Sequence, residues 1–190
     1  MSKNNGVQLR DLGLLALRVG FGAVMMAHGT QKQFGWFGGH GIKGTGAFFE
    51  QIGFRPGEQS ARMAAATELG GGALLIAGLA TPAAGAAAAG TMLVAGRAHK
   101  EQGFFAQEGG FEYQLVLALV GGALALTGAG RISLDHATKH VFDKPWMRVL
   151  AAAAVAPAAG FMVYRRNQAI AQDEAAAAQA EQTEDAGADA

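Results

Sequence analysis

Five ionisable side chains lie within or at the ends of apolar segments, where such groups are rare. They are Arg18, His28, Glu68, His99 and Glu112. Ionisable groups inside membrane segments are costly and usually face a protein interior or a cavity. Histidines and carboxylates can exchange protons with a bound quinol while it is oxidised. These five residues are therefore the predicted ligand-binding cluster, and no catalytic residue is assigned.

The same five residues have other interpretations. Arg18 and Glu68 could pair and clasp two helices, because each charge would compensate the other in apolar surroundings. His28, His99 and Glu112 could be rim residues that meet water and head groups. The two histidines are also candidate axial ligands of a b-type haem, although they are the one plausible pair and a position at the rim is unfavourable for haem. The spacing contains no close ligand motif, so no metal site is predicted.

An aromatic stretch lies beside His99 and Glu112. It contains four aromatic side chains, Phe104, Phe105, Phe111 and Tyr113. Aromatic rings bury large apolar areas and pack against flat ligands. We expect these residues to form the walls of a pocket for a quinone head group.

Long apolar segments must position these side chains. Of the 190 residues, 51% are hydrophobic and only 16% are charged, below the fraction of about a quarter that is usual in soluble domains. Apolar helices are predicted at about 12–30, 60–79, 82–98 and 112–129. The first would be about 28 Å long at 1.5 Å per residue, enough to cross a bilayer core. The predicted fold class is all-α, an integral membrane helical bundle of four core helices in a domain at 12–135, after a polar lead at 1–11.

The segments outside these four helices have distinct compositions. Residues 31–58 are rich in glycine and aromatic side chains, which favours a position at the membrane interface with a short helix near 45–52. Residues 136–166 are predicted as a linker and a fifth C-terminal transmembrane helix at 146–164. Residues 167–190 form an acidic, alanine-rich tail with few large apolar side chains, so we expect the tail to be disordered, or a frayed helix at its start.

Antiparallel threading brings the polar residues to one side. The first and third helices would end, and the second and fourth begin, at the same membrane face. His28, His99 and Glu112 would then share a rim, with Glu68 about 12 Å below it. The runs Gly71–Leu74 and Gly121–Leu124 have the same sequence, which indicates either a tandem duplication of a helical hairpin or a chance match.

Composition also limits the partners. The formal net charge is zero, so a nucleic-acid partner is not expected. The chain has no cysteine, which excludes disulfides and thiolate metal sites. The expected partners are the lipid bilayer and other redox-complex subunits, and a homo-oligomer is a further alternative. Basic residues are divided evenly between the two sides, so the orientation is left open.

Several segments resemble the DoxX family of small bacterial membrane proteins. The resemblance covers roughly 12–135 and rests on LRVGFGAVMMAHGTQKQFG, ATELGGGALLIAGL and the stretch from MLVAGRAHKEQGFF to GAGRISLD. It implies a four-helix, multi-pass domain in the bacterial cytoplasmic (inner) membrane. The fifth segment and the tail lie outside the similar region.

The resemblance implies a redox setting without specifying a reaction. The family takes its name from a small subunit associated with archaeal quinol oxidase and thiosulfate:quinone oxidoreductase, and some actinobacterial relatives are linked to oxidative-stress complexes. The favoured function is an accessory subunit of a quinone-linked or oxidative-stress oxidoreductase system, rather than an enzyme on its own. Alternatives are a non-catalytic membrane anchor for soluble redox enzymes and a small-molecule permease with Glu68 and Arg18 along its path.

Overall fold

The computed structural model describes residues 7–188, in which all regular secondary structure is helical, as predicted. The α-helices are α1 (Leu9–Phe34), α2 (Gly41–Gln51), α3 (Gly57–Ala77), α4 (Thr81–Ala98), α5 (Glu112–Thr127), α6 (Leu134–Ala137) and α7 (Pro145–Ala188). Short 3₁₀ turns are η1 (Trp36–Gly38), η2 (Lys100–Gln102) and η3 (Ala106–Glu108).

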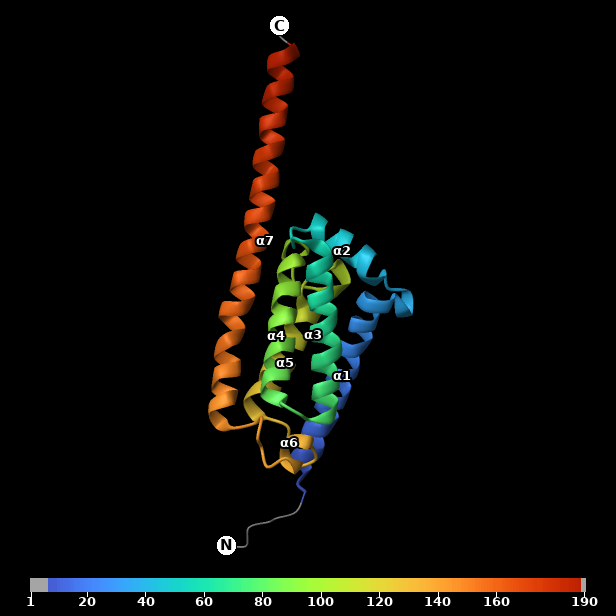
Figure 1. Cartoon of the computed structure of the whole chain (residues 1–190), viewed down its shortest axis with the longest axis vertical. Helices are drawn as coiled ribbons and strands as arrows, with labels where there is room; N and C mark the ends of the chain where they lie inside the picture. Colours follow the sequence, from blue (N-terminus) through green and yellow to red (C-terminus); the bar gives the residue numbers. More distant parts are fainter. Residues whose placement is uncertain (1–6, 189–190) are drawn as a thin grey trace.

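Helices α1, α3, α4 and α5 form the bundle (Figure 1). Helix α1 packs on α3, α4 packs on α5, and contacts between α3 and α4 join the two pairs. Each pair meets at glycines: a Cβ added at Gly22 would lie 2.6 Å from the carbonyl oxygen of Gly72, and one at Gly85 would lie 2.6 Å from that of Gly121. Small residues thus let the backbones approach closely, as is common in membrane bundles.

The ends of α1 and α2 differ from the prediction. Helix α1 continues to Phe34, four residues beyond the predicted end, and stops where Gly35 adopts a left-handed conformation with φ of 74°. Lys32 is therefore helical and lies one turn after His28. Helix α2 begins at Gly41, earlier than predicted, and packs on α3 and α1 across one end of the bundle.

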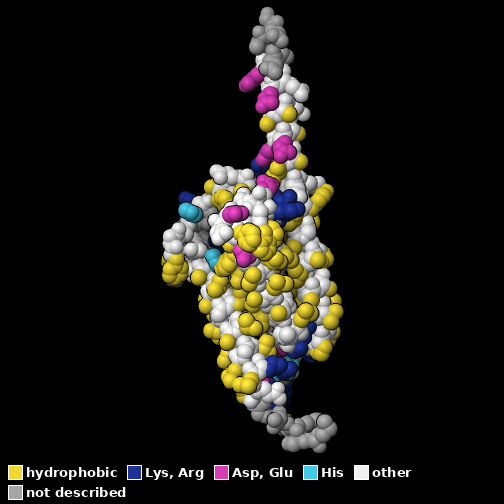
Figure 2. Space-filling view, turned by 180° about the vertical axis from the view of Figure 1, so that it is seen from behind, with side chains coloured by type: hydrophobic (Ala, Val, Ile, Leu, Met, Phe, Trp, Pro, Cys, Tyr) yellow, Lys and Arg dark blue, Asp and Glu magenta, His cyan; other side chains and the backbone are white. Residues whose placement is uncertain are grey.

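The sides of the bundle expose large apolar side chains, whereas charged side chains gather toward its ends (Figure 2). The exposed apolar residues include Leu12, Leu17, Val19, Leu93, Val116, Leu119, Leu126, Val149, Leu150 and Phe161. Two stretches, Leu9–Phe34 and Pro145–Glu184, are long and apolar enough to cross a membrane, and the apolar α5 is shorter at 16 residues. A contiguous apolar surface of this kind fits contact with lipid.

Helix α7 is continuous over 44 residues, or about 66 Å at 1.5 Å per residue, and extends beyond the α2 end of the bundle (Figure 1). Residues 167–188 are thus helical, well beyond the frayed start that the sequence suggested, while 189–190 lie outside the described residues. Alanine, glutamine and glutamate are strong helix formers. Extension of a helix that is already nucleated costs little, so this segment needs no buried face of its own.

The opposite end of the bundle, near α6, is closed by buried polar contacts. The carboxylate of Asp135 is fully buried and accepts hydrogen bonds from the backbone N–H groups of Ala80 and Thr81, at 2.8 and 3.0 Å. These groups lie at the start of α4, where backbone N–H groups lack helical partners. The segment that contains Asp135 therefore fixes the start of α4.

Candidate functional site

A cavity of about 770 Å³ lies between α3, α4 and α7, with α2 across one end. Its volume is within the usual range of about 300–1,000 Å³ for ligand pockets. Most of its lining is apolar and small. The lining includes Met63 and Ala64 of α3, Ala83, Ala87, Gly90 and Ala95 of α4, and Ala151, Val155, Ala158 and Met162 of α7.

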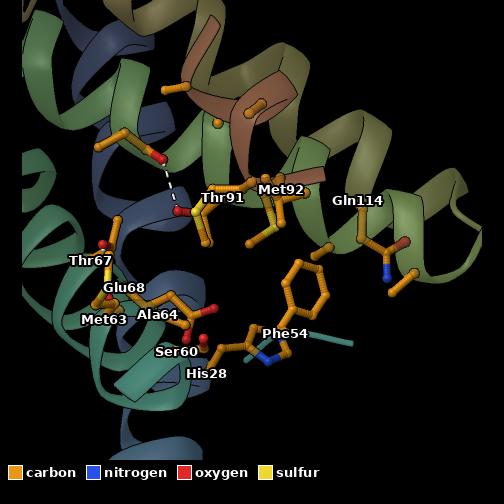
Figure 3. A pocket seen from close by; sticks show the side chains of 18 of the residues that line it. His28, Phe54, Ser60, Met63, Ala64, Thr67, Glu68, Thr91, Met92 and Gln114 are labelled. Carbon is orange, nitrogen blue, oxygen red and sulfur yellow. Dashed lines mark hydrogen bonds between the residues drawn. The ribbon is translucent and has the colours of Figure 1, made fainter. Parts of the chain in front are cut away.

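Ionisable side chains line the end of the cavity nearest α2. They are His28 and Lys32 of α1, Glu68 of α3, His99 after α4 and Tyr113 of α5. Figure 3 shows His28 beside Glu68 in the cavity wall. Three members of the predicted cluster thus line one cavity, although they come from three separate regions of the sequence.

Glu68 is paired with Lys32. The Lys32 Nζ atom lies 2.8 and 2.7 Å from the two carboxylate oxygens of Glu68. The Glu68 side chain is 2% exposed and that of Lys32 is 20% exposed. The predicted Arg18–Glu68 pair is therefore wrong, because the extension of α1 places a nearer cation beside the carboxylate.

Arg18 lies away from the cavity and has a structural role. Its guanidinium is fully buried and donates to three backbone carbonyls, those of Leu75 at 2.9 Å, Ile76 at 3.2 Å and Ile132 at 2.5 Å. The first two belong to the last turn of α3, whose carbonyls lack the usual helical partner four residues later. Arg18 thus ties α1 to α3 and to the segment after α5. It acts as a clasp between helices, but its partners are backbone carbonyls rather than Glu68.

The two histidines have different environments. The Nε2 atom of His28 lies 3.2 Å from the hydroxyl oxygen of Tyr113. The Nδ1 atom of His99 lies 2.9 Å from the carbonyl oxygen of Gly109. Because a carbonyl only accepts, Nδ1 of His99 carries the proton in this bond, and Nε2 is left to exchange a proton or bind a ligand.

Glu112 does not line the cavity. Its Oε2 atom accepts a hydrogen bond of 3.1 Å from the backbone N–H of Ala106. This bond fixes the loop between α4 and α5, so the proposed role of Glu112 in ligand binding has no geometric support.

The aromatic walls also differ from the prediction. Phe104 packs on Phe105 and Phe111, with ring centroids 5.3 and 5.5 Å apart, within the loop and away from the cavity. Of the four predicted aromatic residues, Tyr113 lines the cavity. The other aromatic lining residues are Phe48, Phe49 and Phe54 in and after α2.

The sequence prediction missed Lys32 and Gln114. His28 and Lys32 are four residues apart and would share a helix face, but the predicted helix ended before Lys32. Gln114 lines the cavity, and its Oε1 atom is buried without a hydrogen-bond partner among the described residues. Figure 3 shows Gln114 across the cavity from His28 and Glu68.

A helical bundle with apolar sides and a cavity with one polar end is typical of membrane-associated helical proteins. The family model DoxX matches residues 13–100. A protein of Bacillus subtilis (strain 168) named "Putative oxidoreductase CatD" is 36% identical over 125 residues, which are 66% of this chain and 86% of that protein. The chain belongs to the DoxX family. No solved structure gives a significant match to it.

The family match covers only part of the cavity. Residues 13–100 contain His28, Lys32, Glu68 and His99. The wall formed by α7 lies outside this range.

Proposed function

We propose that this chain is a multi-pass protein of the bacterial cytoplasmic (inner) membrane, crossed by α1, α3, α4, α5 and the apolar first half of α7. The exposed apolar sides of the bundle support this arrangement. Helix α3 has 21 residues and would be about 31 Å long, enough to cross the hydrocarbon core. Helices α3 and α4 need fewer large apolar residues because other helices cover part of their surface.

We propose further that the chain is an accessory subunit of a quinone-linked or oxidative-stress oxidoreductase system and holds a quinone in the cavity. One observation carries this proposal: a cavity of about 770 Å³ is lined mainly by apolar side chains and has its ionisable groups at one end. The name of the Bacillus subtilis relative, an oxidoreductase, agrees with a redox setting.

The lining residues fit a quinone, which has two polar oxygens on an aromatic ring and is otherwise apolar. The Tyr113 hydroxyl, the His28 ring and Nε2 of His99 provide groups that bind such oxygens. The buried Oε1 atom of Gln114, which has no partner among the described residues, can accept a hydrogen bond from a hydroxyl of the reduced quinol. A buried polar atom left unpaired costs free energy, so a ligand that bonds to it is favoured.

A bound quinone would supply two-electron redox chemistry, and the protein would position the head group and handle protons. His28 and Tyr113 would orient one ring oxygen through their shared hydrogen bond. Glu68 would accept or hold the proton. Lys32, whose side chain is 20% exposed, would pass protons between the Glu68 carboxylate and the outer surface. Residues of the apolar walls would exclude water from the ring.

A non-catalytic anchor for soluble redox enzymes is a second candidate, and the extension of α7 favours it. The segment 174–184 is helical, projects beyond the α2 end of the bundle and carries exposed acidic side chains. Such a segment could dock a soluble partner outside the membrane. A permease has less support, because Arg18, which was expected to lie along its path together with Glu68, does not line the cavity.

The direct test is the quinone content of protein purified in mild detergent, measured by organic extraction and absorption spectroscopy. The proposal predicts close to one quinone per chain. Tyr113→Phe should lower this content severalfold, because it removes the hydroxyl that lies against His28. Glu68→Gln and His99→Ala should also lower it, with thermal unfolding measured to confirm that each variant folds.

Tyr164→Phe is the matched control. Its hydroxyl accepts a hydrogen bond from Gln168 on the exposed surface of α7 and lies outside the cavity. Quinone content equal in Tyr113→Phe and the wild type would contradict the proposed site. A preparation without quinone favours the anchor, and a Soret band would indicate haem at His28 and His99.

A further inference from the structure

The cavity continues as a long groove away from its polar end. Along α4, lining residues run from Ala83 to Ala98, a length of about 22 Å at 1.5 Å per residue. Along α7 they run from Ala151 to Met162. Small and apolar side chains line this part, with Thr91 hydrogen-bonded to the backbone carbonyl of Ala87. The groove therefore offers a polar ligand group few partners beyond the polar end.

The groove opens to the side of the bundle. Helix α7 packs on α4 and α5, and it forms no extensive contact with α3. Helix α4 is thus the floor of the groove, with α3 and α7 as its walls. Met63 in the α3 wall is 62% exposed, so the groove reaches the apolar outer surface rather than a sealed interior.

We infer that the groove binds the isoprenoid tail of the quinone along α4 and that the ligand enters sideways from the bilayer, between α3 and α7. This inference rests on the proposed function of the cavity. A long apolar tail fits an apolar groove that is open to lipid and ends at the polar side chains. Much of the binding free energy would then come from burial of the tail rather than from the head group.

Gly90 provides a selective test, because it lies in the groove and a Cβ added there would meet no atom within 4 Å. Gly90→Leu should therefore fold and fill the groove. Gly122 on α5 is the matched control, since a Cβ added there also meets no atom within 4 Å and the residue does not line the cavity. Both variants replace a partly exposed helical glycine by the same side chain.

The experiment measures binding of two probes with the same naphthoquinone ring. Menadione has no tail, and its analogue carries a geranylgeranyl tail. The inference predicts that the wild type binds the tailed probe at least about tenfold more tightly than menadione, an effect that burial of a few methylene groups supplies. Gly90→Leu should remove most of this difference in affinity and leave menadione binding unchanged. Gly122→Leu should bind both probes as the wild type does.

Equal affinity for the two probes in the wild type, or equal effects of the two leucine variants, would overturn the tail site while the proposed function stands. Failure of the wild type to bind either probe would overturn the proposed function together with the tail site. Mass spectrometry of co-purified lipid completes the test. A phospholipid that is displaced by Gly90→Leu, with no loss of quinone, would assign the groove to an acyl chain and overturn the inference.

Discussion

The ion pair of Lys32 and Glu68 is the residue-scale feature on which the cavity depends. A carboxylate with 2% exposure needs a compensating cation, and α1 supplies it from the turn after His28. Breaking a buried pair costs more than replacing both partners, because the remaining charge is left uncompensated. The pair should therefore act as a unit, in stability as well as in proton handling.

We predict that Lys32→Met destabilises the fold by about 3 kcal/mol, because it leaves the Glu68 carboxylate buried and unpaired. Glu68→Gln should cost less, since the remaining Lys32 side chain can extend toward water. The double variant should recover most of the loss. Denaturation in detergent measures these free energies, and a double variant whose loss equals the sum of the two single losses would show that the residues do not interact.

The sequence predicted part of the site. His28, Glu68 and His99 were correctly predicted to lie at one site. They are ionisable residues in or beside apolar segments, and such groups need a shared polar environment. The cation that pairs with Glu68 could not be predicted, since its identity depends on where α1 ends. Gly35 was one of several candidate stop signals in a glycine-rich segment. The position of Arg18 was also predicted wrongly. Its partners are backbone carbonyls, which every residue has, so the side-chain composition does not indicate them.

At the scale of elements, α7 is both a wall of the cavity and a projection beyond it. Its contact with the segment after α2 includes a two-point pair, in which Arg55 donates from its two Nη atoms to the Asp173 carboxylate at 2.9 and 2.5 Å. Arg166 adds a cation–π contact over the Phe54 ring at 5.8 Å. These contacts fix the position of α7 beside the α2 end of the cavity.

The Arg55–Asp173 pair makes this contact dependent on pH. The hydrogen bonds from Arg55 hold the pKa of Asp173 below its usual value of 3.8. Because the carboxylate is favoured by the pair, the stabilisation is present above about pH 3.8 and is lost as the pH falls through the lowered pKa. We predict that the contact between α7 and the segment after α2 loosens locally at low pH, and at neutral pH in Asp173→Asn, while the packing of α7 on α4 is retained.

Spin labels can measure this movement, because the chain has no native cysteine and labels attach only to cysteines that are introduced. Gln51→Cys and Ala177→Cys place the labels on α2 and α7. The distance distribution should broaden in Asp173→Asn and stay unchanged in Glu174→Gln, which removes a neighbouring exposed charge. The same broadening in both variants would show that the pair has no specific effect.

The helical elements were more predictable than their packing. Apolar runs located α3, α4 and α5 within a few residues, since length and hydrophobicity define such helices. The continuation of α7 was missed because low hydrophobicity was interpreted as disorder, although alanine and glutamate favour a helix without any buried face. The groove between α3 and α7 could not be predicted, because it arises from two helices that do not pack together.

At the scale of the whole molecule, the two ends of the bundle have different roles. Buried Arg18 and Asp135 close the α6 end through hydrogen bonds with backbone groups. The α2 end leaves the polar side chains of the cavity available to a ligand. One end thus supports the fold, whereas the other presents groups that can exchange protons.

The most direct test of the account is photolabelling of the intact protein with a quinone that carries an azido group on its ring, followed by peptide mapping. We predict label on the peptides that contain His28, Lys32, His99 or Tyr113, which line the polar end of the cavity, and loss of this label when excess unlabelled quinone competes. Label spread over lipid-facing residues such as Leu119 and Leu126, and insensitive to that competition, would contradict a quinone site in this cavity.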